Sequence, residues 1–392
     1  MKKFISVLLG GVMALSLAAC SSDTSTAAPA ASSTAKSSAP ASSAAAPANS
    51  EVTPAAQDEM RIVMVTDYGE ITDKSFNQTT YEASKAWAEA NGCDFTYKRP
   101  ASDADQDREA AIEEAIEEGY NVVVLPGFAF GTVVSEVAPT YPDVKFIALD
   151  VAGATLSENA YSAVYQEELA GYMAGYAAVK LGYKKLGFLG GMAVPSVVRY
   201  GFGFVQGADA AAVELGLDDV TVNYVYGGKF FGDAGITAKM DTWYAAGTEV
   251  VFACGGSIYT SACEAAAKVN AKVIGVDVDQ SAAIDGDYGE GMTVTSAMKG
   301  LAATVNTMLD VIKAGKWADF GGKEENLGIV SDDPSENYVQ LPTTTQWADG
   351  FTEADYKDLV KKLHSGEIKV ANGIDAMPAT EKVTVTDEGS MG

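Results

Sequence analysis

The segment Ile62-Val63-Met64-Val65-Thr66-Asp67 begins with an uninterrupted run of four apolar residues and ends, after Thr66, in a carboxylate. A continuous run, unlike an alternating one, is typical of a parallel strand with both faces covered. Residues 75–91 follow with the pattern of a helix. This order of strand, loop and helix recurs along the chain, which predicts an α/β fold.

The alternation falls into two series. Further strands are expected at 94–98, 122–125 and 146–149 in the first, and at 186–189, 220–225, 250–253, 273–276 and 292–295 in the second. Further helices are expected at 107–118, 197–215, 236–246, 259–270, 298–314 and 355–364. Because a single core rarely grows beyond about 250–300 residues, the 392 residues predict two doubly wound parallel-sheet lobes.

The lobes are joined by a hinge of several segments. We expect residues 58–163 to form the first lobe and 164–296 the second, with a crossover near Ala163. Residues of roughly 297–315 return to the first lobe. Small residues within 166–176 allow a helix there to approach a neighbour closely. Part of 316–392 is expected in the second lobe, and periodicity does not place the rest.

The N-terminus has the features of a secretory signal. Lys2 and Lys3 precede an apolar stretch at 4–16, and small residues lead up to Cys20, which resembles a bacterial lipobox. We therefore expect a signal peptide at 1–19 and lipidation of Cys20; the alternative is ordinary cleavage near Ala19. Residues 20–57, rich in Ser, Ala, Thr and Pro, are expected to be a tether to the extracytoplasmic face of the cell membrane.

The composition limits the classes of function. With 27 Lys and Arg against 53 Asp and Glu, the formal net charge is −26, which argues against nucleic-acid binding. A single histidine argues against His-based catalysis and metal binding, and no catalytic or metal site and no cofactor is predicted. Cys93, Cys254 and Cys263 fit small buried side chains, with a Cys254–Cys263 disulfide left open.

Three predicted strands end in aspartate, at Asp67, Asp150 and Asp277. Ligands of open α/β sheets bind beyond the carboxyl ends of the strands, so these side chains are expected to face the cleft between the lobes. Ionised carboxylates only accept hydrogen bonds, which suits sugars and nucleosides. The alternative is that each aspartate caps the following helix or turn.

The loop after the first strand leads into a helix for which Asp73 or Ser75 is a candidate N-cap. Phe76 and Asn77 then lie in the first helical turn, at the mouth of the cleft. An aromatic ring there can stack on a base or a sugar, and Asn77 offers both a donor and an acceptor. The alternative for Phe76 is an ordinary core position.

The second lobe offers groups that can face the first across the cleft. The glycine-rich segment 227–233 contains Phe230 and Phe231, either of which can present a ring to a ligand. Gly256 lies in a Gly-Gly-Ser segment whose backbone either binds a ligand or caps a helix. Lys299 can donate to hydroxyl groups; the alternative is an exposed lysine.

Motifs lie at 65–78, 166–175, 190–192, 198–204 and 275–280. Together they resemble the basic membrane protein family of lipoproteins, which includes the purine nucleoside receptors of bacterial ABC importers. The first is Val65-Thr66-Asp67-Tyr68-Gly69-Glu70-Ile71-Thr72-Asp73-Lys74-Ser75-Phe76-Asn77-Gln78, with Thr72 where the family usually has Asp. Others are Gly275-Val276-Asp277-Val278-Asp279-Gln280, the segment 166–175, and Gly190-Gly191-Met192 with the segment 198–204. The resemblance extends from Arg61 to about Ala314.

The resemblance implies a type I periplasmic-binding-protein fold that holds a nucleoside between two aromatic rings. Phe76 and Phe231 would be the stacking pair. The remaining ligand-binding residues that it implies are Asp67, Asn77 and Asp150 from the first lobe, and Gly256, Asp277 and Lys299 from the second lobe or hinge.

We therefore expect a monomeric, lipid-anchored receptor, not an enzyme, that captures a nucleoside and delivers it to an ABC transporter permease. The preference for purines, of the inosine, guanosine or adenosine class, comes from the resemblance alone. A sugar or autoinducer receptor on the same fold is the main alternative. A nucleoside hydrolase that uses paired carboxylates is a further alternative.

Overall fold

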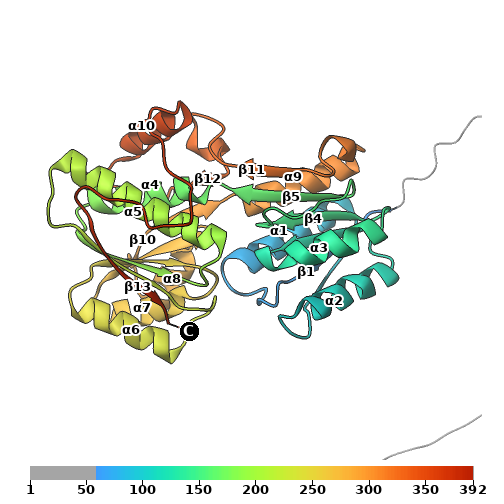
Figure 1. Cartoon of the computed structure of the whole chain (residues 1–392), viewed down its shortest axis with the longest axis horizontal. Coiled ribbons are helices and arrows are strands. Elements are labelled where there is room, and N and C mark those ends of the chain that lie inside the picture. Colours follow the sequence, from blue (N-terminus) through green and yellow to red (C-terminus); the bar gives the residue numbers. More distant parts are fainter. Residues whose placement is uncertain (1–58, 392) are drawn as a thin grey trace, which may run out of the picture. The chain divides into compact units, whose positions relative to one another are not determined.

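The computed structural model describes residues 59–391, so the predicted signal peptide, Cys20 and nearly all of the tether lie outside the described residues. The described residues form one compact unit, and Figure 1 shows the arrangement of its helices and strands. Among residues 59–391, no helix combines the length and the apolar character needed to cross a membrane.

The first sheet has six strands in the order β11-β5-β4-β3-β1-β2, and every neighbouring pair is parallel. Its strands are β1 (Arg61–Val65), β2 (Asp94–Lys98), β3 (Val122–Pro126), β4 (Lys145–Leu149), β5 (Ala160–Tyr165) and β11 (Glu324–Leu327). Strand β3 is buried along its whole length, as its continuous apolar run predicts, and β5, which the sequence analysis does not predict, is buried to the same extent.

The second sheet has seven strands in the order β12-β10-β9-β8-β6-β7-β13, and only the β10–β12 pair is antiparallel. Its strands are β6 (Lys185–Gly190), β7 (Thr221–Tyr226), β8 (Val250–Cys254), β9 (Lys272–Asp277), β10 (Thr293–Lys299), β12 (Val339–Gln340) and β13 (Thr384–Ser390). The prediction of an α/β fold with two parallel sheets is confirmed.

The helices cover the sheets in layers that match three apolar clusters. The largest cluster joins both sheets to α1 (Phe76–Asn91), α4 (Glu167–Lys180), α5 (Pro195–Leu215), α9 (Leu301–Lys313) and α10 (Glu353–His364). The second packs α2 (Asp105–Glu117) and α3 (Gly131–Val137) on the first sheet. The third packs α6 (Ala234–Ala245), α7 (Tyr259–Ala267) and α8 (Ser281–Tyr288) on the second sheet. Short 3-10 turns lie at Phe128–Phe130, Ala138–Thr140, Trp317–Asp319 and Pro334–Glu336.

The structure corrects the predicted boundary near Lys299. The sequence predicts a helix from Met298, but β10 continues through Lys299 and α9 begins at Leu301. The cause is a distant strand, because Lys299 pairs with Val339 of β12 and this pairing extends β10. Lys299 is therefore held on a sheet strand.

The C-terminal segment returns to the second sheet. The side-chain amide of Gln206 on α5 forms two hydrogen bonds with the backbone of Ala371, both of 2.9 Å. The Asp209 carboxylate accepts the backbone N–H groups of 381–383. Strand β13 then pairs with β7 at the sheet edge (Figure 1).

Helices α4 and α5 pack through glycines, as the small residues of 166–176 predict. A Cβ atom added to Gly171 would lie 2.1 Å from the carbonyl oxygen of Tyr200, and one added to Gly207 would lie 1.9 Å from that of Tyr172. These neighbours are backbone atoms that side-chain rotation cannot move. The close approach therefore depends on the absence of side chains.

We expect Gly171→Ala to lower the free energy of unfolding by about 1–3 kcal/mol, because the two helices must move apart. Gly286→Ala is the matched control, since Gly286 lies in α8 with no atom within 4 Å of an added Cβ. That change should be neutral or slightly stabilising. Denaturant unfolding measures both, and equal effects would contradict the account of the α4–α5 contact.

Candidate functional site

A cavity of about 580 Å³ lies beyond the carboxyl ends of the strands of both sheets. The loops after β1 to β4 line it from the first sheet, and the ends of β6 to β10 line it from the second. All eight residues that the sequence predicts for a ligand site line this cavity: Asp67, Phe76, Asn77, Asp150, Phe231, Gly256, Asp277 and Lys299.

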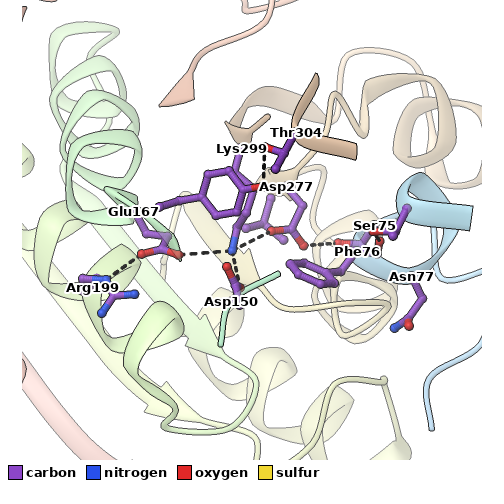
Figure 2. A network of polar contacts seen from close by, with 12 residues as sticks. Ser75, Phe76, Asn77, Asp150, Glu167, Arg199, Asp277, Lys299 and Thr304 are labelled. Carbon is purple, nitrogen blue, oxygen red and sulfur yellow. Dashed lines mark hydrogen bonds and ion pairs between the residues drawn. The ribbon is translucent and has the colours of Figure 1, made fainter. Parts of the chain in front are cut away.

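Lys299 is the centre of the charged part of the cavity. Its Nζ lies 2.7 Å from Asp150 Oδ2, 3.4 Å from Glu167 Oε1 and 3.8 Å from Asp277 Oδ1. Glu167 also accepts a hydrogen bond of 2.6 Å from Arg199 Nε. Figure 2 shows these side chains converging from several elements on one ammonium group.

The Lys299 side chain is only 2% exposed, so its charge depends on these partners. Burial alone would lower the pKa of Lys299, but Asp150, Glu167 and Asp277 together raise it above its ordinary value. Burial raises the pKa of Asp150 to about 6, although Lys299 opposes this shift. Burial also raises the pKa of Asp277 against the opposing effects of Lys299 and Ser75. The lysine remains charged.

Two of the three strand-end aspartates have unusual backbone conformations. Asp150 has φ of 61° and Asp277 has φ of 66°, in the left-handed region that non-glycine residues seldom occupy. Such strain is typical of positions that the surrounding structure holds for a function. Here it turns both carboxylates toward Lys299.

The two lobes contact each other beside this cluster. Ser75 Oγ, from the loop before α1, donates to Asp277 Oδ2 at 2.5 Å, as Figure 2 shows. Gln280 Nε2 donates to the carbonyl oxygen of Lys74 at 3.0 Å. The carboxylate of Asp277 therefore links a strand end of the second lobe to the helix start of the first.

The sequence offers Asp73 and Ser75 as candidate caps of α1, and only the side chain of Asp73 caps the helix. Its carboxylate accepts the backbone N–H groups of Ser75, Asn77 and Gln78, at 2.9, 3.0 and 3.1 Å. Ser75 occupies the N-cap position without a capping hydrogen bond from its side chain. Burial raises the pKa of Asp73 to about 6, while these three N–H groups lower it. This cap fixes the first turn and so places Phe76 and Asn77.

Asp67 and Asn77 form a polar pair inside the cavity. Asn77 Nδ2 and the backbone N–H of Gly69 donate to Asp67 Oδ1, at 3.2 and 2.8 Å. Burial raises the pKa of Asp67, and these two donors oppose the shift. Asn77 Oδ1 is buried and has no hydrogen-bond partner among the described residues. The pair therefore keeps acceptor capacity for a ligand.

The aromatic residues of the cavity differ in how they are held. The Lys299 Nζ lies 5.1 Å from the centre of the Phe76 ring. Phe230 packs on glycines, since a Cβ on Gly191 or Gly255 would lie 2.4 or 2.7 Å from its ring. Phe231 is 57% exposed, with Lys229 Nζ 5.4 Å from its ring centre.

Gly256 lies in a loop, since α7 begins at Tyr259. It has φ of 50°, and an added Cβ would lie 2.5 Å from the carbonyl oxygen of Phe230. Ser257 forms a parallel bridge with Phe231. Glycine at 256 is therefore needed to bring the Phe230–Phe231 segment against this loop.

Several residues that line the cavity or contact its lining were missed by the sequence reasoning. Phe128 lies just beyond β3 and could have been found by the rule that selected the aspartates. Arg108 and Tyr200 lie within predicted helices, where nothing in the local pattern separates them from other helical residues. Glu167 contacts Lys299 across 132 positions of sequence, which no local pattern reveals.

Cys93, Cys254 and Cys263 are free thiols, so the disulfide that the sequence left open is not formed. Burial raises the pKa of Cys254 and of Cys263, which keeps both thiols protonated. Within residues 59–391, no group of His, Cys, Asp and Glu side chains has the arrangement of a metal site.

We expect Lys299→Met to lower the free energy of unfolding by about 3–5 kcal/mol at pH 7.5, because three carboxylates lose their shared cation. The loss should be clearly smaller at pH 5. Asp150 already has a pKa of about 6 with the lysine present, and without it the folded chain binds protons more readily still. Denaturant unfolding at both pH values measures the effect.

The control for this prediction is Lys357→Met, which removes an exposed lysine paired with Glu353 on the surface of α10. Little change is expected at either pH. An equal loss for Lys299→Met at pH 5 and pH 7.5 would contradict the account, since the penalty would then not come from unbalanced carboxylates.

Comparison with known proteins gives a consistent result. The family model described as "ABC transporter substrate-binding protein PnrA-like" matches residues 60–367. The ABC transporter nucleoside-binding protein BmpA of Lactococcus lactis is 28% identical over 277 residues, which cover 66% of this chain and 76% of that protein. The CD4+ T-cell-stimulating antigen of Listeria innocua is 27% identical over 340 residues, covering 80% and 88%.

Solved structures agree on the fold. A solute-binding protein of an ABC transporter system from Aeropyrum pernix superposes with a TM-score of 0.67 at 21% identity, covering 81% of this chain and 94% of that one. A counterpart from Conexibacter woesei gives 0.64 at 22% identity, covering 80% and 99%. These neighbours confirm the predicted periplasmic-binding-protein architecture.

Proposed function

This chain belongs to the Bmp family of PnrA-like ABC transporter substrate-binding proteins, and we propose that it binds a purine nucleoside in the cavity between its two sheets. The observation that carries the proposal is the division of the cavity into two chemically different parts. One part presents charged groups around Lys299, and the other presents aromatic rings with an aspartate–asparagine pair.

The charged part suits the hydroxyl groups of a ribose. Asp150 Oδ1 is buried without a partner among the described residues, and Asp277 Oδ1 is 3.8 Å from Lys299 Nζ, beyond hydrogen-bonding distance. A carboxylate accepts a hydrogen bond from a hydroxyl group, and the Lys299 ammonium can donate a hydrogen bond to the oxygen of that hydroxyl group. A sugar hydroxyl can use both properties at once.

The charge of the cavity favours a neutral ligand. Six carboxylates line it against three cationic side chains: Asp67, Glu70, Asp73, Asp103, Asp150 and Asp277 against Arg99, Arg108 and Lys299. A phosphate group would meet a net negative surrounding. Nucleosides are therefore favoured over nucleotides.

The aromatic part suits a base. Phe76 is anchored in the capped first turn of α1, and Phe231 presents a ring that is more than half exposed. When a flat apolar ligand covers an exposed aromatic ring in a cavity, apolar surface is removed from water and the free energy of binding becomes more favourable. We assign the stacking pair to Phe76 and Phe231, with Gly256 bringing backbone close to the ligand.

The proposed function needs no chemical step. The ligand is enclosed between the lobes, and the closed form is delivered to the permease of an ABC importer. Cys20 is proposed to carry the lipid that holds the monomeric protein at the outer face of the cell membrane. The alternatives are a sugar or autoinducer ligand and hydrolysis of the nucleoside; titration with sugars and recovery of intact inosine separate a sugar ligand and hydrolysis from the proposal.

The central test is calorimetric titration of the full chain, kept in mild detergent, after removal of any bound ligand by unfolding and refolding. We expect saturable binding of inosine or guanosine and none of ribose or galactose. Inosine should be recovered intact after incubation. Binding of a sugar alone, or release of free hypoxanthine, would contradict the proposal.

Removing either stacking ring should weaken nucleoside binding. We expect Phe76→Ala and Phe231→Ala each to raise the dissociation constant tenfold or more, since a base–aromatic stack is worth about 1–3 kcal/mol. Phe230→Ala is the control for position. Because Phe230 packs on glycines, its loss should lower stability more than affinity. The opposite pattern would assign the stacking to Phe230.

Lipid anchoring has its own test. In cells, the wild-type chain should fractionate with membranes and incorporate labelled fatty acid. Cys20→Ser should abolish the label and release the chain from the membrane fraction. Cys93→Ser, which changes a thiol in the folded unit, should alter neither. Membrane association and label that persist in Cys20→Ser would contradict the anchor.

A further inference from the structure

The order of the strands places the cavity residues in a line. In the first sheet, Asp150 follows β4 and Asp67 follows β1, with β3 between these two strands, and Arg108 of α2 lies beside Asp67, its Nη2 3.4 Å from the Asp67 carbonyl oxygen. In the second sheet, Lys299 ends β10, whereas Phe231 forms a bridge with Ser257 after β8, so β9 lies between these two positions. Lys299 contacts Asp150, so these two mark one end of the cavity and Arg108 belongs to the other.

Arg108 is a buried arginine in the wall of this cavity. The residue is only 6% exposed. Its Nη1 donates to Asp105 Oδ1 at 2.9 Å, and its Nη2 lies 3.4 Å from the backbone carbonyl oxygen of Asp67. Its Nε has no hydrogen-bond partner among the described residues.

The guanidinium therefore has unused donors. It carries five N–H bonds, and the two contacts above leave the Nε–H and one N–H on each terminal nitrogen without an acceptor among residues 59–391. Unpaired buried donors are costly, so a bound ligand with acceptor atoms at this end would be stabilised. The neighbouring Arg99 differs, because it already contacts Glu70 at 2.5 Å and the carbonyl oxygen of Tyr68 at 3.1 Å.

Acceptors lie beside these donors. Asp67 uses Oδ1 for Asn77 and Gly69, and its Oδ2 accepts from no other described residue. Asn77 Oδ1 also lacks a partner in the described part of the chain. This end of the cavity thus combines a fork of donors with one or two acceptors.

The purine bases differ in how they match this pattern. Guanine and hypoxanthine present adjacent acceptors at O6 and N7, which arginine recognises with two hydrogen bonds. Both bases also carry an N1–H group that can donate a hydrogen bond to a carboxylate. Adenine presents an amino group in place of O6, so one arginine donor would face another donor.

We infer that Arg108 is a specificity-determining residue that binds the O6 and N7 edge of the base, so that the protein prefers 6-oxopurine nucleosides to adenosine. Asp67 accepts from N1–H of the same base. The inference rests on the proposed function, because it needs the base to lie at the Phe231 end of the cavity.

The test is calorimetry of the full chain with guanosine, inosine, adenosine and 7-deazaguanosine. We expect guanosine and inosine to bind about tenfold or more tightly than adenosine. We expect 7-deazaguanosine, which lacks the N7 acceptor, to bind more weakly than guanosine. Equal affinities for guanosine and adenosine, or for guanosine and 7-deazaguanosine, would overturn the inference and leave nucleoside binding intact.

The variants separate base recognition from support of the fold. Arg108→Gln should reduce the preference for guanosine over adenosine to the part that Asp67 provides, and remove the penalty for 7-deazaguanosine, while adenosine still binds. Arg108→Lys keeps the charge but not the planar fork, and should lose most of the preference. Arg61→Gln is the matched control, since Arg61 pairs with Asp94 outside the cavity, and it should keep the wild-type ratios.

The failures are distinguishable. An Arg108→Gln protein that binds every nucleoside more weakly by the same factor would show a structural role and overturn the inference. If neither Arg108 variant folds, the wild-type comparison of guanosine with 7-deazaguanosine decides alone. If the wild type binds no nucleoside, the proposed function itself is wrong, and the inference falls with it.

Discussion

The buried ammonium of Lys299 is the interaction on which the site depends. A charge removed from water needs opposite charges close by, and this one receives them from strand ends of both sheets and from the start of α4. Asp150 and Asp277, both in left-handed backbone conformations, direct their carboxylates toward this ammonium, with oxygens 2.7 and 3.8 Å from Nζ. The carboxylates are therefore placed before any ligand arrives.

For the proposed nucleoside ligand, this preorganisation means that one cavity offers different groups to the ribose and to the base. Near Lys299, closely spaced acceptors and a donor match hydroxyl groups. Toward Phe231 and Arg108, flat apolar surface and a donor fork match a heterocycle. Because strand order separates these groups, the fold itself gives the ligand a direction. The Asp73 cap holds the first turn of α1 and so fixes the positions of Phe76 and Asn77 in the cavity.

Much of the fold and the site could be predicted because the relevant patterns are local. Continuous apolar runs predict parallel strands, and Asp67, Asp150 and Asp277 follow such runs directly. Strands β5, β11, β12 and β13 were missed, since β11 and β13 are polar and largely exposed and the two residues of β12 are too few to form a pattern. Lys299 was expected in a helix because the distant β12 that extends its strand cannot be seen locally. Glu167 and Arg108 could not be selected from the sequence, because their contacts with Lys299 and Asp67 join segments that are far apart in the chain.

The most direct test of the central claim is a crystal structure of the protein with guanosine bound. The account predicts the ribose hydroxyl groups on Asp150, Asp277 and Lys299, and the base between Phe76 and Phe231 with its O6 and N7 edge toward Arg108. A ligand bound outside this cavity, or with its base against Lys299 and its ribose toward Arg108, would contradict the account.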